Sequence, residues 1–141
     1  MTMHCNLEHE THATLRIMGD DLDPSEVTRA LSVEPSFARR KGDIYGNPDR
    51  PVRSRTGIWA LESEGSVKSG ELEEHLRFLA GRLSPEARRH IGHLRAQGYQ
   101  VDILCYWMSG TGQGGPVLTA DVLLVLGGLG AELSFDFYSS S

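Results

Sequence analysis

Long apolar runs are absent from this sequence of 141 residues. The longest, around residues 122–126, is far shorter than the roughly 18 residues that suggest a membrane-spanning helix. The N-terminus also lacks the basic end followed by an apolar stretch that marks a secretory signal peptide. We therefore expect a protein that has no contact with a membrane.

Cysteine is scarce, because Cys5 and Cys105 are the only two in the chain. Cys105 lies in the alternating apolar stretch 101–107, where a cysteine is typical of a small buried side chain. Cys5 lies in the polar N-terminal region, so the two thiols form no disulfide framework. Reduced thiols and a cytoplasmic location follow as expectations.

An excess of positive charge is also missing, since the formal net charge is −5. General nucleic-acid binding usually needs a basic face, so nucleic acid is a disfavoured partner. The length and a 39% apolar content are ordinary for one globular domain. We expect a tail over residues 1–11, a single α/β domain over 12–138, and a disordered C-terminus over 139–141.

Local patterns predict alternating strands and helices. Ala13, Leu15 and Ile17 alternate with polar residues, which is typical of a half-buried strand. Asp23-Pro24 followed by Glu26 resembles a helix start with a capping box. A leucine stripe predicts a helix that opens at Ser69, formed by Leu72, Leu76, Leu79 and Leu83. Further strands are expected at 37–43, 57–62, 99–108 and 133–138, a loop at 43–55, and a second helical stretch after Pro85.

Residues 119–126 are compatible with either a helix or a strand, because periodicity does not separate the two in a short apolar run. Taken as a helix, the segment completes an α+β fold. The fold would have a mainly antiparallel or mixed sheet with helices on one face. Its element order would be the ferredoxin-like βαββαβ followed by an extra αβ unit.

Four short motifs, in their order and spacing, resemble the bacterial family known as domain of unknown function 4279. They are Lys41-Gly42-Asp43, Gly57-Ile58-Trp59-Ala60-Leu61-Glu62-Ser63, Leu72-Glu73-Glu74-His75-Leu76 and Leu133-Ser134-Phe135-Asp136-Phe137-Tyr138. The resemblance covers roughly residues 14–138. It implies one compact α/β domain, and it carries over no activity, cofactor or catalytic residue.

Basic residues concentrate in one stretch, 39–55. It has a net charge of +4, which leaves −9 on the rest of the chain, and its basic members are Arg39, Arg40, Lys41, Arg50, Arg53 and Arg55, against Asp43 and Asp49. Arginine has a planar donor fork suited to carboxylate or phosphate. The stretch is either a surface for anions or acidic partners, or a solvated loop that balances the acidic helices.

Two tryptophans and one aspartate are further candidates. Trp59 and Trp107 share strand faces with aliphatic residues, so core packing is their default, but either could also line an interface or a pocket. Trp59 lies close to Arg55 in sequence and could border the basic stretch. Asp136 is predicted to face away from its neighbours Phe135 and Phe137, as an exposed residue or as a salt-bridge partner of the arginines.

Patterns for catalysis, metals and nucleotides are weak. His4, Cys5, His9 and His12 fall in or beside the expected tail, and His90 and His93 lack a third metal ligand. The glycine-rich stretch 110–115 lacks the Gly-Lys-Ser/Thr ending of a phosphate loop. Cys105 is predicted to be buried, and no serine sits in a Gly-x-Ser-x-Gly elbow. We therefore expect no cofactor, no metal and no catalytic residue.

The leading hypothesis is a non-enzymatic binding or protein-interaction module that uses the basic stretch, with Lys41, Asp43, Arg53 and Arg55 at its site. Its partner would be a protein with an acidic surface, and the module could form a homodimer. The alternative is a small-molecule anion-binding domain or enzyme, with a pocket between these residues and Trp59.

Overall fold

Strands and helices alternate along this protein, for which a computed structural model describes residues 9–110 and 114–139. The strands are β1 (His9–Gly19), β2 (Phe37–Arg39), β3 (Ile44–Tyr45), β4 (Val52–Arg53), β5 (Gly57–Glu62), β6 (Gln100–Ser109) and β7 (Glu132–Ser139). The helices are α1 (Pro24–Leu31), α2 (Leu72–Gly81), α3 (Pro85–Ala96) and α4 (Ala120–Leu129). Across these two described ranges, every helix is too short or too polar to cross a lipid bilayer.

One mixed sheet of five strands has the order β2-β5-β1-β6-β7, and β3 and β4 form a separate two-stranded sheet. The neighbours β2/β5, β5/β1 and β1/β6 are antiparallel, whereas β7 runs parallel to β6. A parallel neighbour needs a crossover connection, which the segment containing α4 supplies. The expected α+β class, with a βαββαβ order followed by an αβ unit, is confirmed.

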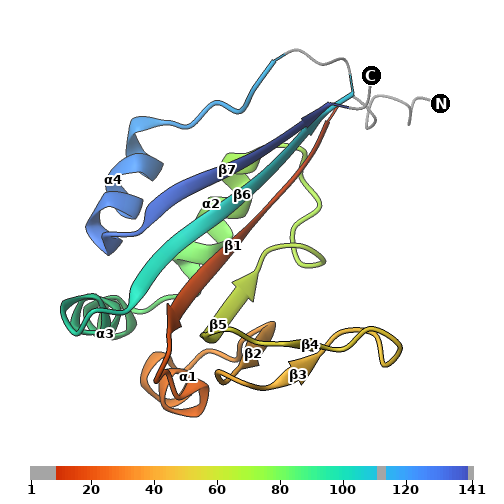
Figure 1. Cartoon of the computed structure of the whole chain (residues 1–141). Coiled ribbons are helices and arrows are strands. Elements are labelled where there is room, and N and C mark those ends of the chain that lie inside the picture. The colour runs from red at the N-terminus through yellow and green to blue at the C-terminus, as the bar shows by residue number, and fades with distance from the viewer. Residues whose placement is uncertain (1–8, 111–113, 140–141) are drawn as a thin grey trace.

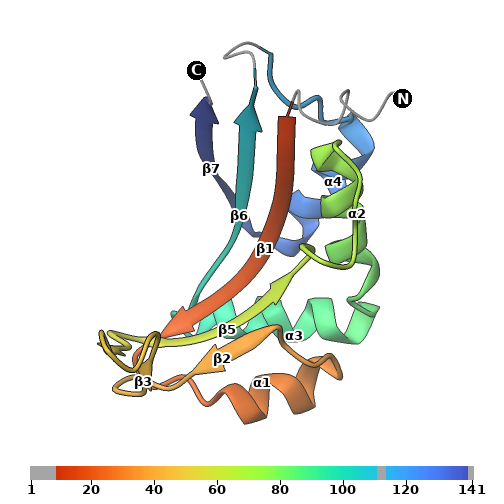
Figure 2. The same cartoon turned by 90° about the vertical axis from the view of Figure 1, so that its right-hand side faces the viewer.

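The helices lie together on one face of the sheet (Figures 1 and 2). Their leucine stripe packs there against the alternating apolar side chains of β1, with Ala13, Leu15 and Ile17 at most 1% exposed. The stripe itself is buried as predicted, at Leu72, Leu76, Leu79 and Leu83. The apolar core therefore fills the layer between the sheet and the helices.

Proline and capping residues determine where the helices begin, but the capping contact of α1 and the first residue of α2 differ from the prediction. Asp23 caps α1, but its carboxylate accepts from the backbone N–H of Ser25, and Pro24 takes the first helical position. The leucine-rich helix begins at Leu72 rather than Ser69. Ser69 instead accepts a hydrogen bond from the backbone N–H of Glu71, so its hydroxyl orders the approach to the helix.

The first and last strands of the chain, β1 and β7, extend beyond the expected domain boundaries. β1 begins at His9, so residues 9–11, which were predicted to be tail, belong to the sheet. Their polar side chains give no alternating signal, but the long partner strand holds them, since His9 pairs with Ser109. At the other end, Ser139 is the last residue of β7 and not part of a disordered terminus. Residues 1–8 and 140–141 lie outside the described chain.

Two further segments depart from or complete the prediction. Residues 119–126, left open between helix and strand, enter α4, whose N-cap Thr119 accepts a hydrogen bond from the N–H of Val122. The stretch 43–55, predicted as a loop, contains the β3–β4 hairpin. Its strands are two residues each, too short to show any periodicity.

Candidate functional site

The basic segment, residues 39–55, leaves the sheet at the end of β2 and returns to it at the start of β5. Its β3–β4 hairpin projects from the end of the molecule (Figure 1). Ile44 pairs with Arg53 and Tyr45 with Val52, and all four residues are exposed. The fold therefore presents this segment to solvent as a separate surface.

Ion pairs tie the first part of the basic segment to the end of β1. Lys41 contacts the carboxylate of Asp20 at 3.1 Å, and Arg40 contacts Asp23 at 2.8 Å. The hydrogen bond from Lys41 lowers the pKa of Asp20 below its usual value. Sequence reasoning missed both aspartates, because about twenty residues separate each pair along the chain. These two cations anchor the segment and add little net charge to its surface.

Asp43 and Arg53 act within the segment. The carboxylate of Asp43 accepts a hydrogen bond from the backbone N–H of Arg40 at 2.8 Å. One terminal guanidinium nitrogen of Arg53 donates to the carbonyl oxygen of Gly42 at 3.0 Å. Because a guanidinium has five N–H donors, Arg53 keeps donors for a partner while it braces the hairpin.

Arginines beside apolar side chains make up the outer part of the segment. Arg39 lies over two rings, at 4.8 Å from the centroid of Phe37 and 3.7 Å from that of Tyr45. Such stacking holds a guanidinium in place. The side chains of Arg50 and Arg55 are exposed, and they make no hydrogen bond or ion pair to residues 9–110 or 114–139.

The two tryptophans do not join this surface. Trp59 is 0% exposed, and its indole N–H donates to Thr28 at 3.0 Å, so it belongs to the core and borders no solvent-filled pocket. Trp107 is 7% exposed and lies in the same apolar core. It also lines an apolar hollow of about 210 Å³ beside Pro116 and Val117.

Asp136 is far from the arginines of the basic segment. It lies in β7, which is one edge of the sheet, whereas β2, which leads into the basic segment, is the other edge. Its strand partner is Tyr106. One alternative predicted for Asp136 was a salt bridge to the arginine cluster. This alternative is wrong, because three strands separate the two edges of the sheet.

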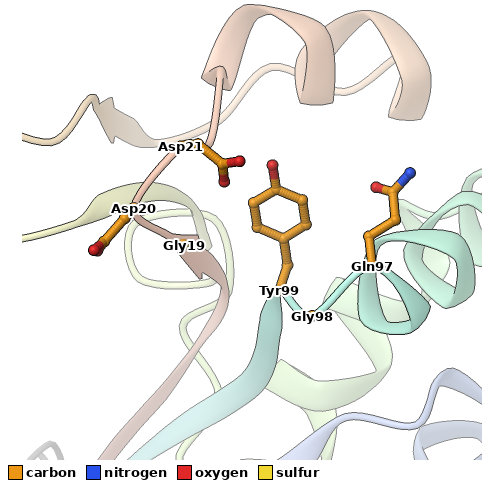
Figure 3. Close-up of a pocket in the computed structure, with 6 residues that line it drawn as sticks. All are labelled: Gly19, Asp20, Asp21, Gln97, Gly98 and Tyr99. Carbon is orange, nitrogen blue, oxygen red and sulfur yellow. The ribbon is translucent and has the colours of Figure 1, made fainter.

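A polar notch opens where β1 ends and β6 begins (Figure 3). It has a volume of about 390 Å³ and is lined by Gly19, Asp20, Asp21, Gln97, Gly98 and Tyr99. The hydroxyl of Tyr99 points toward the carboxylate of Asp21 (Figure 3). This hydrogen bond, followed by partial burial, raises the pKa of Tyr99 above its usual value.

A second hollow of about 190 Å³ shares Gln97 and Tyr99 with the notch and includes Asp23 and Glu26. Carboxylates therefore occur in both hollows, and one of those that line the notch, Asp20, is the ion-pair partner of Lys41. A small anion would be repelled by these carboxylates. The notch and the second hollow are thus unsuited to the anionic ligand that the basic segment itself could attract.

A buried serine and histidine form a contact that the sequence did not indicate. Ser63 and His75 are 0% and 1% exposed, and the Ser63 hydroxyl lies 2.6 Å from Nδ1 of His75. Nε2 of His75 lies 2.7 Å from the carbonyl oxygen of Ser69, which can only accept, so Nε2 carries the proton. The Ser63 hydroxyl therefore donates to Nδ1 while it accepts from the N–H of Ala13. Both side chains are enclosed and fully hydrogen-bonded, which makes the pair structural rather than nucleophilic.

Replacing Ser63 with alanine is expected to lower the free energy of unfolding by about 1–3 kcal/mol, because it leaves buried polar groups unpaired. The N–H of Ala13 and Nδ1 of His75 would both lose their partner. Urea denaturation followed by circular dichroism measures the change. The exposed Ser66 offers a matched control, and indistinguishable curves for the two alanine variants would contradict a structural role.

The other reactive side chains of residues 9–110 and 114–139 form no catalytic arrangement. Cys105 is 0% exposed as predicted, and burial raises its pKa to about 12, which suppresses the reactive thiolate. His12 lies 3.8 Å from Glu64, and His90 packs edge-on against His93. Within the described ranges, no three His, Cys, Asp or Glu side chains are grouped to hold a metal ion. His4 and Cys5 lie outside those ranges.

Comparison with known proteins finds one match. A family model described as a domain of unknown function (DUF4279) matches residues 9–140, which is nearly the whole chain. No curated protein and no solved structure matches. The family suggested by the four short motifs is therefore confirmed.

Proposed function

The chain belongs to the DUF4279 family, a domain of unknown function, so we propose its role from its own surface. We propose that it is a non-enzymatic binding module that recognises an acidic protein through the basic segment. The observation that carries this proposal is the hairpin, which projects from the molecule and exposes arginines beside apolar side chains.

The mixture of side chains on the hairpin favours a protein partner. Ile44, Tyr45 and Val52 are exposed by 56%, 38% and 45%, next to the arginines of the same hairpin. Tyrosine and arginine are enriched among the residues that dominate binding energy at protein interfaces. The apolar side chains supply contact area, and the guanidinium forks can each bind a carboxylate with two parallel hydrogen bonds.

The uneven distribution of charge favours one orientation of an acidic partner. The basic segment has a formal net charge of +4 and the rest of the chain −9. With Arg40 and Lys41 paired to Asp23 and Asp20, the segment keeps +2 and the remainder −7. An acidic partner is attracted to the hairpin and repelled elsewhere, so the encounter is oriented and salt-dependent. A nucleic acid duplex extends well beyond one hairpin, and its phosphates would meet the acidic remainder of the surface.

The alternative of a small anionic ligand has less support. Trp59, the proposed pocket wall, is enclosed in the core. The notch beside Lys41 contains the carboxylates of Asp20 and Asp21. A flat or convex arginine surface suits a protein carboxylate cluster better than a free anion, which needs an enclosing pocket for affinity.

Replacing Arg53 and Arg55 together with alanine is expected to abolish capture of the partner and to leave the fold intact. Both residues are exposed, and exposed substitutions usually change stability by less than ~0.5 kcal/mol. Wild type and variant serve as baits in a lysate of the native cell at low and high salt, with mass spectrometry of the captured proteins. We expect acidic proteins bound by wild type at low salt, released at high salt, and absent with the variant.

A variant with the same loss of charge elsewhere provides the control. Arg82 and Arg89 are exposed residues next to and within the helices, and their double alanine variant should capture the partner like wild type. Undiminished capture by the Arg53/Arg55 variant would contradict the proposal. Titration with inorganic phosphate tests the alternative: binding to wild type that disappears in the Arg53/Arg55 variant would favour a small anion.

A further inference from the structure

The strand β7 is an open edge of the five-stranded sheet. Its eight residues pair on one side with β6, and its sequence is exposed at nearly every position. Phe135, Phe137 and Tyr138 are exposed by 36%, 61% and 54%, and the two phenylalanine rings stack at 5.2 Å. An edge strand with outward main-chain groups and exposed aromatics is a template for another strand.

β7 lacks most of the features that protect an edge strand. Proteins block such edges with charged side chains, above all lysine, and with proline, bulges or a very short strand, and of these β7 has the carboxylates of Glu132 and Asp136. The sequence of β7, Glu132–Ser139, contains neither lysine nor proline, and its pairing with β6 runs without a bulge from Asp102/Glu132 to Ser109/Ser139. A strand of this length, about 27 Å at 3.4 Å per residue, is long enough for several residues on either side of its centre to pair with another strand.

The helix that leads into β7 adds further exposed apolar surface. α4 contains a single charged residue, Asp121, in the sequence ADVLLVLGGL. Val122, Leu126 and Leu129 enter the core, but Leu123 and Leu124 remain 47% and 75% exposed. A helix that is apolar all round is normally covered on all sides. Figure 1 shows α4 on the same side of the molecule as β7, away from the basic hairpin.

We propose that β7 pairs antiparallel with β7 of a second copy of this chain, which makes one continuous sheet across a two-fold axis. Homodimer interfaces are more apolar than other interfaces and are depleted of charge. α4 has one charged residue in ten, and Leu133, Phe135 and Phe137 give β7 one apolar face. A strand that faces its own copy also forms the self-complementary contact that a two-fold dimer requires. The proposal does not depend on the hairpin, which lies beyond the other edge of the sheet.

The side-chain pattern of β7 selects one register for this pairing. A two-fold axis perpendicular to the sheet sets one residue opposite its own counterpart, and opposite residues share a face. An axis at Asp136 would oppose two carboxylates, and an axis at Ser134 would oppose Glu132 and Asp136, both of which are destabilising. An axis at Phe135 instead opposes two phenylalanines and pairs residues 132–138, whereas an axis at Phe137 or Leu133 pairs only 135–139 or 132–134. The dimer is therefore centred at Phe135.

Analytical ultracentrifugation over a range of concentrations tests the dimer. We expect wild type to sediment as a dimer that dissociates on dilution. Phe137→Lys should be monomeric, because it brings lysines into the apolar contact. Val52→Lys is the matched control, since Val52 is 45% exposed on the hairpin, and this variant should remain dimeric. Circular dichroism verifies that each variant is folded.

Cross-linking tests the register independently of the mass. In a Cys5→Ser background, Phe135→Cys should form a disulfide-linked dimer under mild oxidation, because opposite Cα atoms in an antiparallel pair lie within disulfide range. Asp136→Cys should not cross-link, and the buried Cys105 does not interfere. A monomeric wild type, a dimer that persists in Phe137→Lys, or cross-linking at position 136 instead of 135 would overturn the proposal. The monomer would leave the edge to a different partner.

Discussion

Replacing Arg16 with methionine is expected to lower the free energy of unfolding by about 3–5 kcal/mol, the usual effect of removing one partner of a buried ion pair. Arg16 in β1 lies directly opposite Asp102 in β6. Its guanidinium donates two hydrogen bonds to the carboxylate, from Nε at 2.9 Å and from a terminal nitrogen at 2.7 Å. The hydrogen bond to Asp102 raises the pKa of Arg16, although partial burial opposes it.

Unequal burial of the two partners makes the loss large. The side chain of Asp102 is 4% exposed, whereas that of Arg16 is 27% exposed. Removing the arginine therefore strands a carboxylate that water cannot reach, and an unpaired buried charge is strongly destabilising. The pair links the neighbouring strands β1 and β6, so its loss lowers the stability of the whole sheet.

Urea denaturation of a double-mutant cycle measures this effect and contains its own control. The Arg16→Met/Asp102→Leu variant removes both charges, and it should recover much of the stability lost in Arg16→Met, because an apolar pair needs no compensation. A single variant within ~0.5 kcal/mol of wild type would show that the pair is solvated like an ordinary surface salt bridge.

Replacing Leu76 with alanine is expected to cost about 2–5 kcal/mol, the range for truncating a leucine inside a packed core. Leu76 is 0% exposed at the centre of the α2 stripe, and it belongs to the same cluster as Leu15 and Trp59. The loss combines the apolar area no longer buried with the cavity left between α2 and the sheet. Thermal and urea unfolding of the purified variant measure it.

An exposed apolar residue supplies the comparison for Leu76. Val117 is 81% exposed, so Val117→Ala should change the free energy of unfolding by less than ~0.5 kcal/mol. A cost below ~1 kcal/mol for Leu76→Ala would mean that the helix layer repacks around the missing side chain.

Parts of the fold whose signals are local could be predicted from the sequence. The alternation of Ala13, Leu15 and Ile17 and the Asp23-Pro24 helix start need only neighbouring residues to be recognised. The order of strands in the sheet and the parallel direction of β7 depend on contacts between distant segments. The β3–β4 hairpin was missed because two-residue strands carry no period, and the N-terminal end of β1 because its partner β6, not its own side chains, holds it.

The candidate site was visible as a concentration of charge but not as a geometry. Composition alone located the basic segment at residues 39–55. It did not show that Arg40 and Lys41 form ion pairs with Asp23 and Asp20, because these pairs depend on where β1 ends in the fold. The buried Ser63–His75 contact was equally hidden, since both residues have common surface roles in other sequences. Pairing across the fold decides which charges remain for a partner.

The sheet order β2-β5-β1-β6-β7 separates two chemically different edges of the molecule. Four spacings between neighbouring strands, about 4.8 Å each, put these edges roughly 19 Å apart. Substitutions at sites more than about 10 Å apart usually act independently. The two surfaces for which we propose binding, the basic segment and the edge strand β7, can therefore change independently, so that relatives could alter one of them while they retain the other on an unchanged scaffold.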